Sequence, residues 1–315
     1  MSRRSFPAKE EVPPFCRQAA LQSRRMEHPG EDDGPLIHVI HVPKTGGTAM
    51  RDTLFKWAYN AKRGTSLGFK THVYFNACNY QEECSNGSIV RQEHGIFVGH
   101  TGFGIRANAP ANRLNVIIMR EPISRITSFF NYLHFEKRAP ADWSNKSLDG
   151  IFSDYRRVRL SQPEILNTNQ TSLTNRLVHH ILTDQLSYLA SYKCVAPAPD
   201  TNPFNCTRPN RDAGECSVQN MTNMALINLR LADSVIVTSK IDSLIAHLRF
   251  HLRFIPKSEK RISKRNVSKV KRFSRINATT KAWLNDWLKD EIELYKVAER
   301  INREQTEVAS KCAYN

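Results

Sequence analysis

The stretch LIHVIHVPKTGGTAM, residues 36–50, decides the fold. It opens with a run rich in β-branched residues, 36–42, in which two histidines stand among five apolar residues, and this run has the length of a strand. Pro-Lys-Thr-Gly-Gly-Thr follows as a turn. The residues after the turn, about 48–61, show the apolar spacing of a helix at Met50, Leu54, Trp57 and Ala58. Strand, glycine-containing turn and helix in this order predict a phosphate-binding turn at the carboxyl end of a strand.

The same alternation continues along the chain. Further short apolar runs predict strands at 95–100, 114–120 and 234–240. Helices are expected at 122–137, 241–252 and about 279–303, the last one burying Trp283, Trp287, Leu288, Ile292 and Tyr295. Short continuous apolar strands that alternate with helices are typical of a parallel sheet covered on both faces. The sequence therefore predicts an α/β fold with a central parallel sheet flanked by helices.

Domain boundaries follow from shifts in composition. Residues 1–35 are charged and proline-rich without periodicity, which predicts a flexible N-terminal tail. Residues 36–315 are expected to form one domain. The stretch of about 140–230 is partly helical and partly loop-rich, and we interpret it as an insertion on the α/β core.

The overall charge points to an anionic partner. The chain has 315 residues and a formal net charge of +16, so nucleic acid, an acidic membrane surface and a polyanionic glycan are the candidate partners. The run 257–275 has the density of cations to bind a sulfated or carboxylated polymer, although a solvated basic loop is the alternative. Aromatic residues are not interleaved with these charges as stacking on bases would require, so we do not expect nucleic acid.

Cysteines and glycosylation sequons indicate the compartment. Seven Asn-X-Ser/Thr sequons and seven cysteines, several of them in polar loop-like segments, favour a lumenal glycoprotein with disulfide bonds. Free thiols in a cytosolic enzyme are the alternative. Zinc is not expected, because the cysteines form no CxxC pair. No apolar signal segment or membrane-spanning run is visible, so we expect a membrane anchor that is missing from this chain.

The turn at 43–48 has the chemistry of a phosphate site. Gly46 and Gly47 allow the backbone to approach an anion, and the helix amides after them can donate to it. Lys44 adds a mobile cation. The order differs from a Walker A loop, in which glycines precede the lysine, and no strand ending in Asp follows to hold Mg²⁺. This pattern argues against an ATP-dependent kinase and predicts a metal-free site.

A second anion site is predicted after the strand at 114–120. Arg120 ends that strand, and Ser128 lies on the second turn of the following helix. Together they could hold a second phosphate, as in a nucleoside with a phosphate-type group at each end. Arg125 is expected to face outward or to pair with Glu121.

These two segments carry a family resemblance. PKTGGT after a strand and REPISRITSFF after a later one resemble the two nucleotide-binding signatures of sulfotransferases that use 3'-phosphoadenosine-5'-phosphosulfate (PAPS). FVGHTGF and NLRLADSVIVTSKIDSLIAHL are similar to segments of the Golgi group that includes the heparan sulfate and uronyl 2-O-sulfotransferases. The resemblance covers about 36–300 and is weak at 140–220. It departs from that group at His41, where the group has an arginine that is thought to meet the acidic glycan.

The resemblance implies a role for each matching residue. The 5'-phosphosulfate would be held by Lys44, Thr45, Gly46, Gly47 and Thr48. Arg120 and Ser128 would hold the 3'-phosphate. His100 would be the base that deprotonates the acceptor hydroxyl, with Glu93 and His94 as alternatives, and Lys44 would stabilise the leaving phosphate.

The predicted function is therefore transfer of a sulfuryl group from PAPS, as co-substrate and without a metal, to a hydroxyl of a glycan. The expected acceptor is a glycosaminoglycan with uronic acid, and the expected location is the Golgi lumen, membrane-associated in the full-length form. The alternatives are a non-catalytic basic glycan-binding protein on the same fold and a nucleotide-dependent kinase. The oligomeric state is left open, a homo-oligomer included.

Overall fold

The computed structural model describes residues 36–64, 73–76, 96–99, 113–161, 173–190, 195–196, 208–209, 218–251, 261–262 and 276–312. Within these ranges, five strands form one sheet in the order β2-β3-β1-β4-β7. These strands are β1 (Leu36–His41), β2 (Val73–Asn76), β3 (Ile96–Gly99), β4 (Arg113–Met119) and β7 (Ser234–Val237). Every pairing between them is parallel, which confirms the predicted α/β class with a parallel sheet. A short antiparallel pair, β5 (Val195–Ala196) and β6 (Arg208–Pro209), lies outside this sheet.

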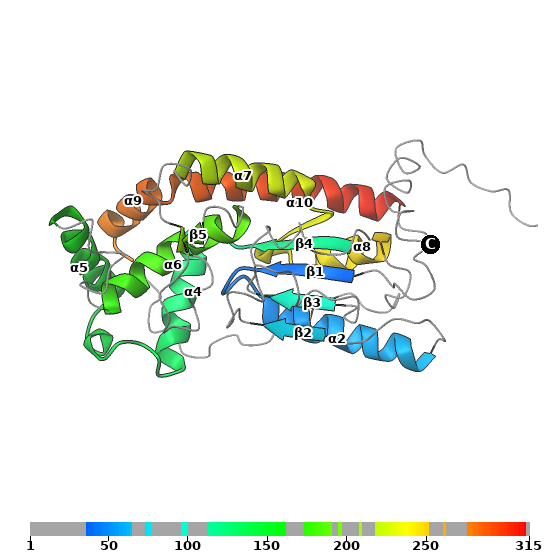
Figure 1. The fold of residues 1–315 in the computed structure, drawn as a ribbon, viewed down its shortest axis with the longest axis horizontal. Coiled ribbons are helices and arrows are strands. Elements are labelled where there is room, and N and C mark those ends of the chain that lie inside the picture. Colours follow the sequence, from blue (N-terminus) through cyan, green and yellow to red (C-terminus); the bar gives the residue numbers. More distant parts are fainter. Residues whose placement is uncertain are drawn as a thin grey trace, which may run out of the picture.

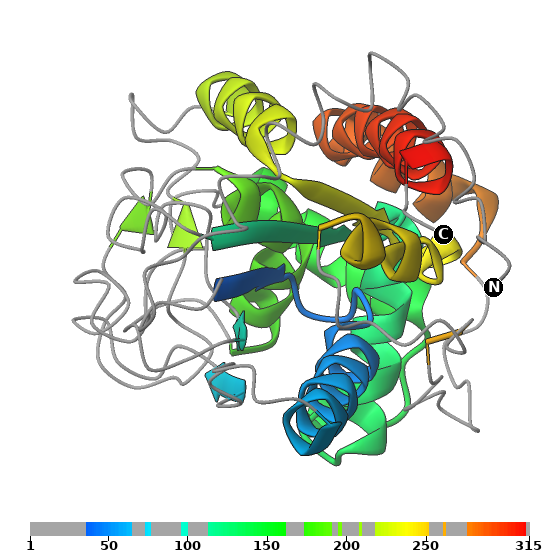
Figure 2. The same cartoon turned by 90° about the vertical axis from the view of Figure 1, so that its right-hand side faces the viewer.

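Alternate residues of the central strands face two different cores. On one face, Ile37, Val39 and Ile118 pack with α2 (Gly47–Gly64) and α8 (Ser243–His251). On the other face, Ile40 and Ile117 pack with α6 (Leu173–Leu189), α7 (Val218–Leu231) and α10 (Lys289–Cys312). Figure 2 looks along the strands and shows α2 and α8 on the same side of the sheet. This two-residue period, with apolar side chains on both faces, explains why the strands read as continuous apolar runs.

A helical block lies beyond the end of the sheet toward which the strands point (Figure 1). It contains α4 (Pro122–Phe135), the 3-10 helix η2 (Ala141–Trp143), α5 (Leu148–Ser161), α6 and α9 (Ala278–Trp287). Its core is aromatic: the Phe130 and Trp143 rings stack at 4.8 Å between centroids, and Phe152 meets Phe130 edge-on at 5.4 Å. This block covers the edge where ligands bind in parallel α/β sheets.

Several element boundaries differ from the predicted ones. The strand expected at 234–240 ends at Val237 and continues as the 3-10 helix η6 (Thr238–Lys240). The helix expected at 279–303 is two helices, α9 and α10, with Leu288 between them. Leu284 and Leu288 pack into the aromatic block while Leu294 packs under the sheet, so the chain changes direction between two cores. Trp283 and Trp287 are only half-buried, and β2 was not predicted.

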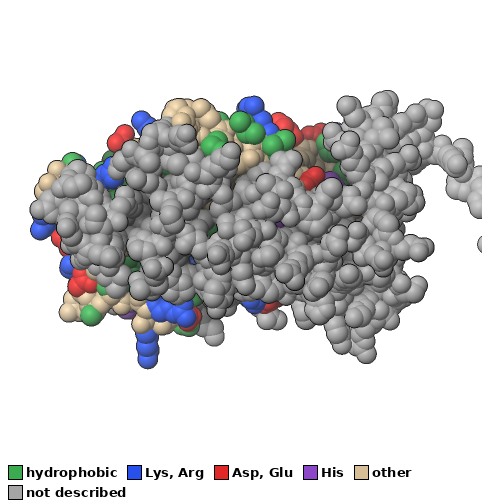
Figure 3. Space-filling model, viewed as in Figure 1, with side chains coloured by type: hydrophobic (Ala, Val, Ile, Leu, Met, Phe, Trp, Pro, Cys, Tyr) green, Lys and Arg blue, Asp and Glu red, His purple; other side chains and the backbone are tan. Residues whose placement is uncertain are grey.

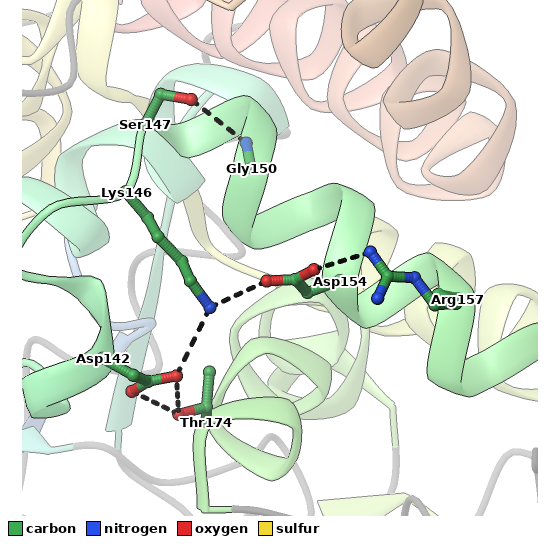
Figure 4. Close-up of polar contacts among 7 residues, drawn as sticks. All are labelled: Asp142, Lys146, Ser147, Gly150, Asp154, Arg157 and Thr174. Carbon is green, nitrogen blue, oxygen red and sulfur yellow. Dashed lines mark hydrogen bonds and ion pairs between the residues drawn. The ribbon is translucent and has the colours of Figure 1, made fainter.

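A polar network fixes the start of α5 and α6 (Figure 4). The Lys146 ammonium lies 2.8 Å from Asp154 and 3.8 Å from Asp142. The Thr174 hydroxyl, in the first turn of α6, donates to the Asp142 carboxylate at 2.9 Å. Arg157 adds a further ion pair to Asp154 at 3.1 Å. Because cation and carboxylates meet each other here, the network orients the helices and offers little charge for a ligand.

The described surface carries both signs of charge. Figure 3 shows Lys and Arg side chains close to Asp and Glu side chains over the helical block, and hydrophobic side chains along the top, over α7. Ile227 and Leu231 are exposed on that helix. The predicted basic run 257–275 lies outside the described residues except for Arg261 and Ile262.

Two further observations concern the helices and the cysteines. No helix in the described ranges is both long and apolar enough to cross a membrane. Cys312, at the end of α10, forms a disulfide bond. Its partner must lie outside the described residues, because the other six cysteines do. The flexible tail predicted at 1–35 also lies outside the described residues.

Candidate functional site

The turn at 43–48 lies at the carboxyl edge of the sheet, where β1, β4 and β7 end. One side chain ties these ends together: the Thr238 hydroxyl donates to the Thr45 carbonyl at 2.7 Å and is 3.0 Å from the Met119 carbonyl. Thr238 directly follows β7, and Met119 is the last residue of β4. The turn is thus fixed to the two neighbouring strands rather than left as a free loop.

The backbone of the turn requires its glycines. Gly46 has a φ of 95°, in the region that favours glycine, and a Cβ there would lie 3.1 Å from the Ile241 side chain. A Cβ on Gly47 would overlap the imidazole ring of His41. Lys44 also has a left-handed φ, 69°, which is uncommon for a residue with a side chain. Such backbone strain persists where the surrounding structure enforces it, and it is concentrated at functional sites.

Thr45 in the turn and His41 at the end of β1 both have structural roles. The buried Thr45 hydroxyl donates to the Val42 carbonyl at 2.8 Å, and the Thr45 amide donates to the same oxygen at 3.2 Å. His41 is buried beneath the turn, with its ring against Gly47. The residue that replaces the arginine of the resembling group is therefore a packing residue under the turn and is not exposed to a polymeric ligand.

Lys44 reaches from the turn to α4. Its Nζ lies 3.9 Å from the centroid of the Tyr132 ring, a cation–π contact. The pKa of Lys44 is lowered to about 8, first by burial of the ammonium and then by the nearby Arg120 guanidinium, while Glu136 acts in the opposite direction. The surroundings of this lysine disfavour its charged form. An anion that binds beside it would stabilise the charged form.

Arg120, the first residue after β4, meets the same turn. Its Nη1 donates to the Lys44 carbonyl oxygen at 3.1 Å. Burial and the neighbouring Arg125 lower the pKa of Arg120, and Glu121 opposes this shift. In the part of the chain that the structure describes, neither Lys44 nor Arg120 forms an ion pair with a carboxylate. Among the described residues, two cations thus lie together at the carboxyl edge of the sheet without an ion pair to a carboxylate.

Ser128 lies on the face of α4 that Lys44 crosses. Ser128 and Tyr132 are one helical turn apart and share a face, and Arg120 precedes the same helix. No described residue hydrogen-bonds the half-buried Ser128 hydroxyl, whereas the neighbouring Thr127 hydroxyl donates to the Ile123 carbonyl at 2.9 Å. The structure therefore joins Arg120 to Lys44 by a hydrogen bond, and Ser128 lies one helical turn before Tyr132, the residue that Lys44 contacts.

The expectation for Arg125 was wrong. Its side chain is fully buried and donates to the Ile181 carbonyl of α6 at 2.6 Å. Glu121 instead caps α4, because its carboxylate accepts from the Ile123 and Ser124 amides at 3.0 and 2.6 Å. The helix N-terminus is thus already occupied by a carboxylate. An anion beside Arg120 would be held by side chains rather than by free amides of α4.

Gln185 of α6 also contacts Arg120, and the sequence analysis did not predict it as a site residue. It is fully buried, and its Oε1 accepts from the Arg120 backbone amide at 3.3 Å. An N–H can only donate, so the atom that faces it is the amide oxygen. The Gln185 Nε2 has no hydrogen-bond partner among the described residues, and an unpaired buried donor of this kind costs about 1–3 kcal/mol.

The signals that could have found the missed residues were weak. Tyr132 and Gln185 sit in ordinary amphipathic helices, in which an aromatic residue and a glutamine are common. Neither residue belongs to a motif. Only the packing of α4 and α6 against the carboxyl edge brings them beside Lys44 and Arg120.

The predicted base and its alternatives lie outside the described residues. β3 ends at Gly99, which pairs with Ile40 of β1, so the strand before His100 ends at the edge that carries the turn. The side chains of His100, Glu93 and His94 are not described. In the described ranges, no group of three or more His, Cys, Asp or Glu side chains could hold a metal ion. Lysine, arginine and hydroxyl side chains make up the site instead.

A second polar cluster lies at the amino end of β7. The Gln305 Oε1 accepts from the Val235 amide at 2.7 Å, and its Nε2 donates to the Ala232 and Asp233 carbonyls at 3.2 and 3.3 Å. His247 is buried between the Ser234 and Thr306 hydroxyls at 2.7 and 2.8 Å. Because the buried His247 ring has a hydroxyl partner at each nitrogen and Ser234 is buried with it, the Ser–His pair is structural rather than a nucleophile.

Comparisons with known proteins add no name. No known family model matches this chain, and a search of curated proteins finds no match. The functional conclusion therefore rests on the residues of the site and on the sequence motifs that they belong to.

Proposed function

We propose that the protein is a PAPS-dependent sulfotransferase that acts on a glycan hydroxyl, with a sulfotransferase fold of the P-loop-like type. The observation that carries the proposal is the hydrogen bond of Arg120 to Lys44 at the carboxyl edge, together with the contact of Lys44 with Tyr132, one helical turn from Ser128. These groups can donate hydrogen bonds, and none of them is paired with a described carboxylate. A nucleotide with two separate phosphate-type groups fits such a set of hydrogen-bond donors.

The donor set also fits the chemistry of sulfuryl transfer. Lys44 would bind the phosphate that leaves, and the amides at the start of α2 would share its charge. Arg120 and the open Ser128 hydroxyl would bind the phosphate at the other end of the nucleoside. Thr45 would act by closing the turn, since its hydroxyl and its amide both donate to Val42.

The reaction would proceed by in-line displacement. A base, His100 by resemblance, would take the proton of the acceptor hydroxyl. The hydroxyl oxygen would form a bond to sulfur as the bond from sulfur to the bridging phosphate oxygen breaks. The products would be a sulfate ester and adenosine 3',5'-bisphosphate, with Lys44 beside the oxygen that gains negative charge.

The net charge and the cysteines support the proposed acceptor and the proposed location. A net charge of +16 suits an acidic glycan such as a glycosaminoglycan. The disulfide bond at Cys312 suits an oxidising compartment, such as the lumen of the secretory pathway. Buried His41 cannot reach a polymer from beneath the turn, so residues outside the turn would select the acceptor.

Calorimetric titration with adenosine 3',5'-bisphosphate in the presence of EDTA tests the donor site. Wild type is expected to bind, and Arg120→Ala to lose about a hundredfold in affinity, because it removes a charged donor to phosphate. Arg230→Ala is the matched control, since it removes the same charge from the exposed face of α7. Folded wild type that does not bind would contradict the enzyme proposal and favour a non-catalytic glycan-binding protein.

Activity distinguishes the remaining alternatives. Wild type with PAPS and a desulfated glycosaminoglycan is expected to form a sulfate ester in EDTA. Phosphate transfer from ATP that EDTA abolishes would instead identify a nucleotide-dependent kinase.

A further inference from the structure

Gln185 lies outside every motif of the sequence, yet it contacts the main chain of the second anion site. We propose that Gln185 positions Arg120 and thereby sets the preference for a nucleotide that carries a second phosphate. This inference rests on the function proposed above and adds a specificity-determining residue to it.

The first step is how Arg120 is held. It follows the last residue of β4, so its amide lies beyond the hydrogen bonds of the strand. Gln185 accepts from that amide at 3.3 Å, and the guanidinium at the far end of the same residue donates to the Lys44 carbonyl. Arg120 is therefore anchored at its main chain by α6 and at its tip by the phosphate-binding turn.

The second step is that α6 supports the whole region from one side. Thr174 and Gln185 are about three turns apart and share a face of the helix. The Thr174 hydroxyl donates a hydrogen bond to Asp142 of η2, the element that follows α4 (Figure 4). The Ile181 carbonyl accepts a hydrogen bond from Arg125 of α4. Gln185 makes the third contact, at Arg120. Any shift of α6 would move Arg120 relative to Lys44, and thus the spacing of the two anion sites.

The third step is a comparison of two glutamines. Gln305 and Gln185 both accept from a backbone amide at the end of a strand. Gln305 also donates to two carbonyls, so all its hydrogen-bonding groups have partners. The Gln185 Nε2 has no partner among the described residues, so its main-chain contact with Arg120 is the only hydrogen bond of this side chain there. The contrast indicates that Gln185 is held for its contact with Arg120 and not for a satisfied structural cluster.

The experiment compares two nucleotides on three proteins. Calorimetric affinities for adenosine 3',5'-bisphosphate and adenosine 5'-monophosphate are measured on wild type, Gln185→Met and Gln305→Met. In Gln185→Met the preference for the bisphosphate is expected to fall about tenfold, through loss of affinity for the bisphosphate alone. Gln305→Met removes the same side chain chemistry at the opposite edge of the sheet and is expected to keep the wild-type preference.

Three results would overturn the inference. An unchanged preference in Gln185→Met, or an equal loss of affinity for both nucleotides, shows that Gln185 has no role or a purely structural one. Folded wild type that binds neither nucleotide overturns the proposed function and this inference with it. If Gln185→Met fails to fold, Gln185→Asn takes its place with the same expected result, because it keeps an amide but is too short to reach Arg120.

Discussion

Polar side chains are paired differently at the two ends of the strands of the parallel sheet. At the amino edge of β7, Gln305 and His247 find partners on both sides of their polar groups. At the carboxyl edge, Lys44 and Arg120 approach each other with no described carboxylate between them, and the Gln185 amide nitrogen has no described acceptor. Buried polar groups that satisfy one another stabilise the fold. Hydrogen-bond donors that are buried without acceptors destabilise the fold. A ligand that accepts hydrogen bonds from them would offset this loss of stability.

The largest expected effect is a loss of folding stability at acid pH, caused by His247 at the amino end of β7. Burial, and then the charge of His251, lower the pKa of His247 to about 4. The unfolded chain takes up a proton on this histidine below about pH 6.5, whereas the folded protein does so only below about pH 4. Stability that is present above pH 6.5 is therefore lost as the pH falls to 4, by about 3 kcal/mol from this residue.

Urea unfolding of wild type and His247→Gln at pH 7 and pH 4.5 measures this contribution. The free energy of unfolding of wild type is expected to fall more steeply with acid than that of the variant, which has no group to titrate at this place. Equal losses in the two proteins would show that the amino edge is not a proton-sensitive structural cluster.

The next effect concerns ligand affinity at the carboxyl edge. The ammonium of Lys44, which faces Arg120, Glu136 and the Tyr132 ring, has a pKa of about 8 in the free protein. Below pH 8 it is charged and ready to bind an anion, and above pH 8 it must first take up a proton. Affinity for adenosine 3',5'-bisphosphate is therefore expected to decrease by up to about tenfold per pH unit above pH 8.

Lys44→Arg is the matched control, because a guanidinium stays charged over this range. Titrations between pH 7 and 9.5 are expected to show a flat affinity in Lys44→Arg and a declining one in wild type. The same slope in both proteins would mean that another group titrates, and that Lys44 is not the cation that binds the phosphate.

The smallest effect is expected at Thr238, which joins the carboxyl edge to the fold. Thr238→Val removes the hydrogen bonds to the Thr45 and Met119 carbonyls and is expected to lower the free energy of unfolding by about 1 kcal/mol. Thr127→Val removes a hydroxyl bond that stays within its own helix and is expected to cost less than about 0.5 kcal/mol. Equal unfolding midpoints in urea for the two variants would show that the turn does not depend on Thr238.

Much of the local structure could be predicted from the sequence by itself. The apolar run at 36–42 and the spacing of Met50, Leu54 and Trp57 predicted a strand and a helix that the structure confirms, with those three side chains buried. These features depend on the chain's own periodicity, so no distant residue is needed to recognise them. Lys44, Arg120 and Ser128 were predicted as site residues from the same kind of pattern, because each belongs to a short strand–turn–helix motif.

The tertiary structure alone decided how those motifs are completed. Arg125 was expected at the surface and is buried, because α6 covers α4 and offers it the Ile181 carbonyl. Tyr132 and Gln185 reach the site across large separations in sequence, through packing that no local pattern encodes. Local periodicity determines which elements form, whereas the pairing of side chains from different elements depends on how their apolar faces pack together.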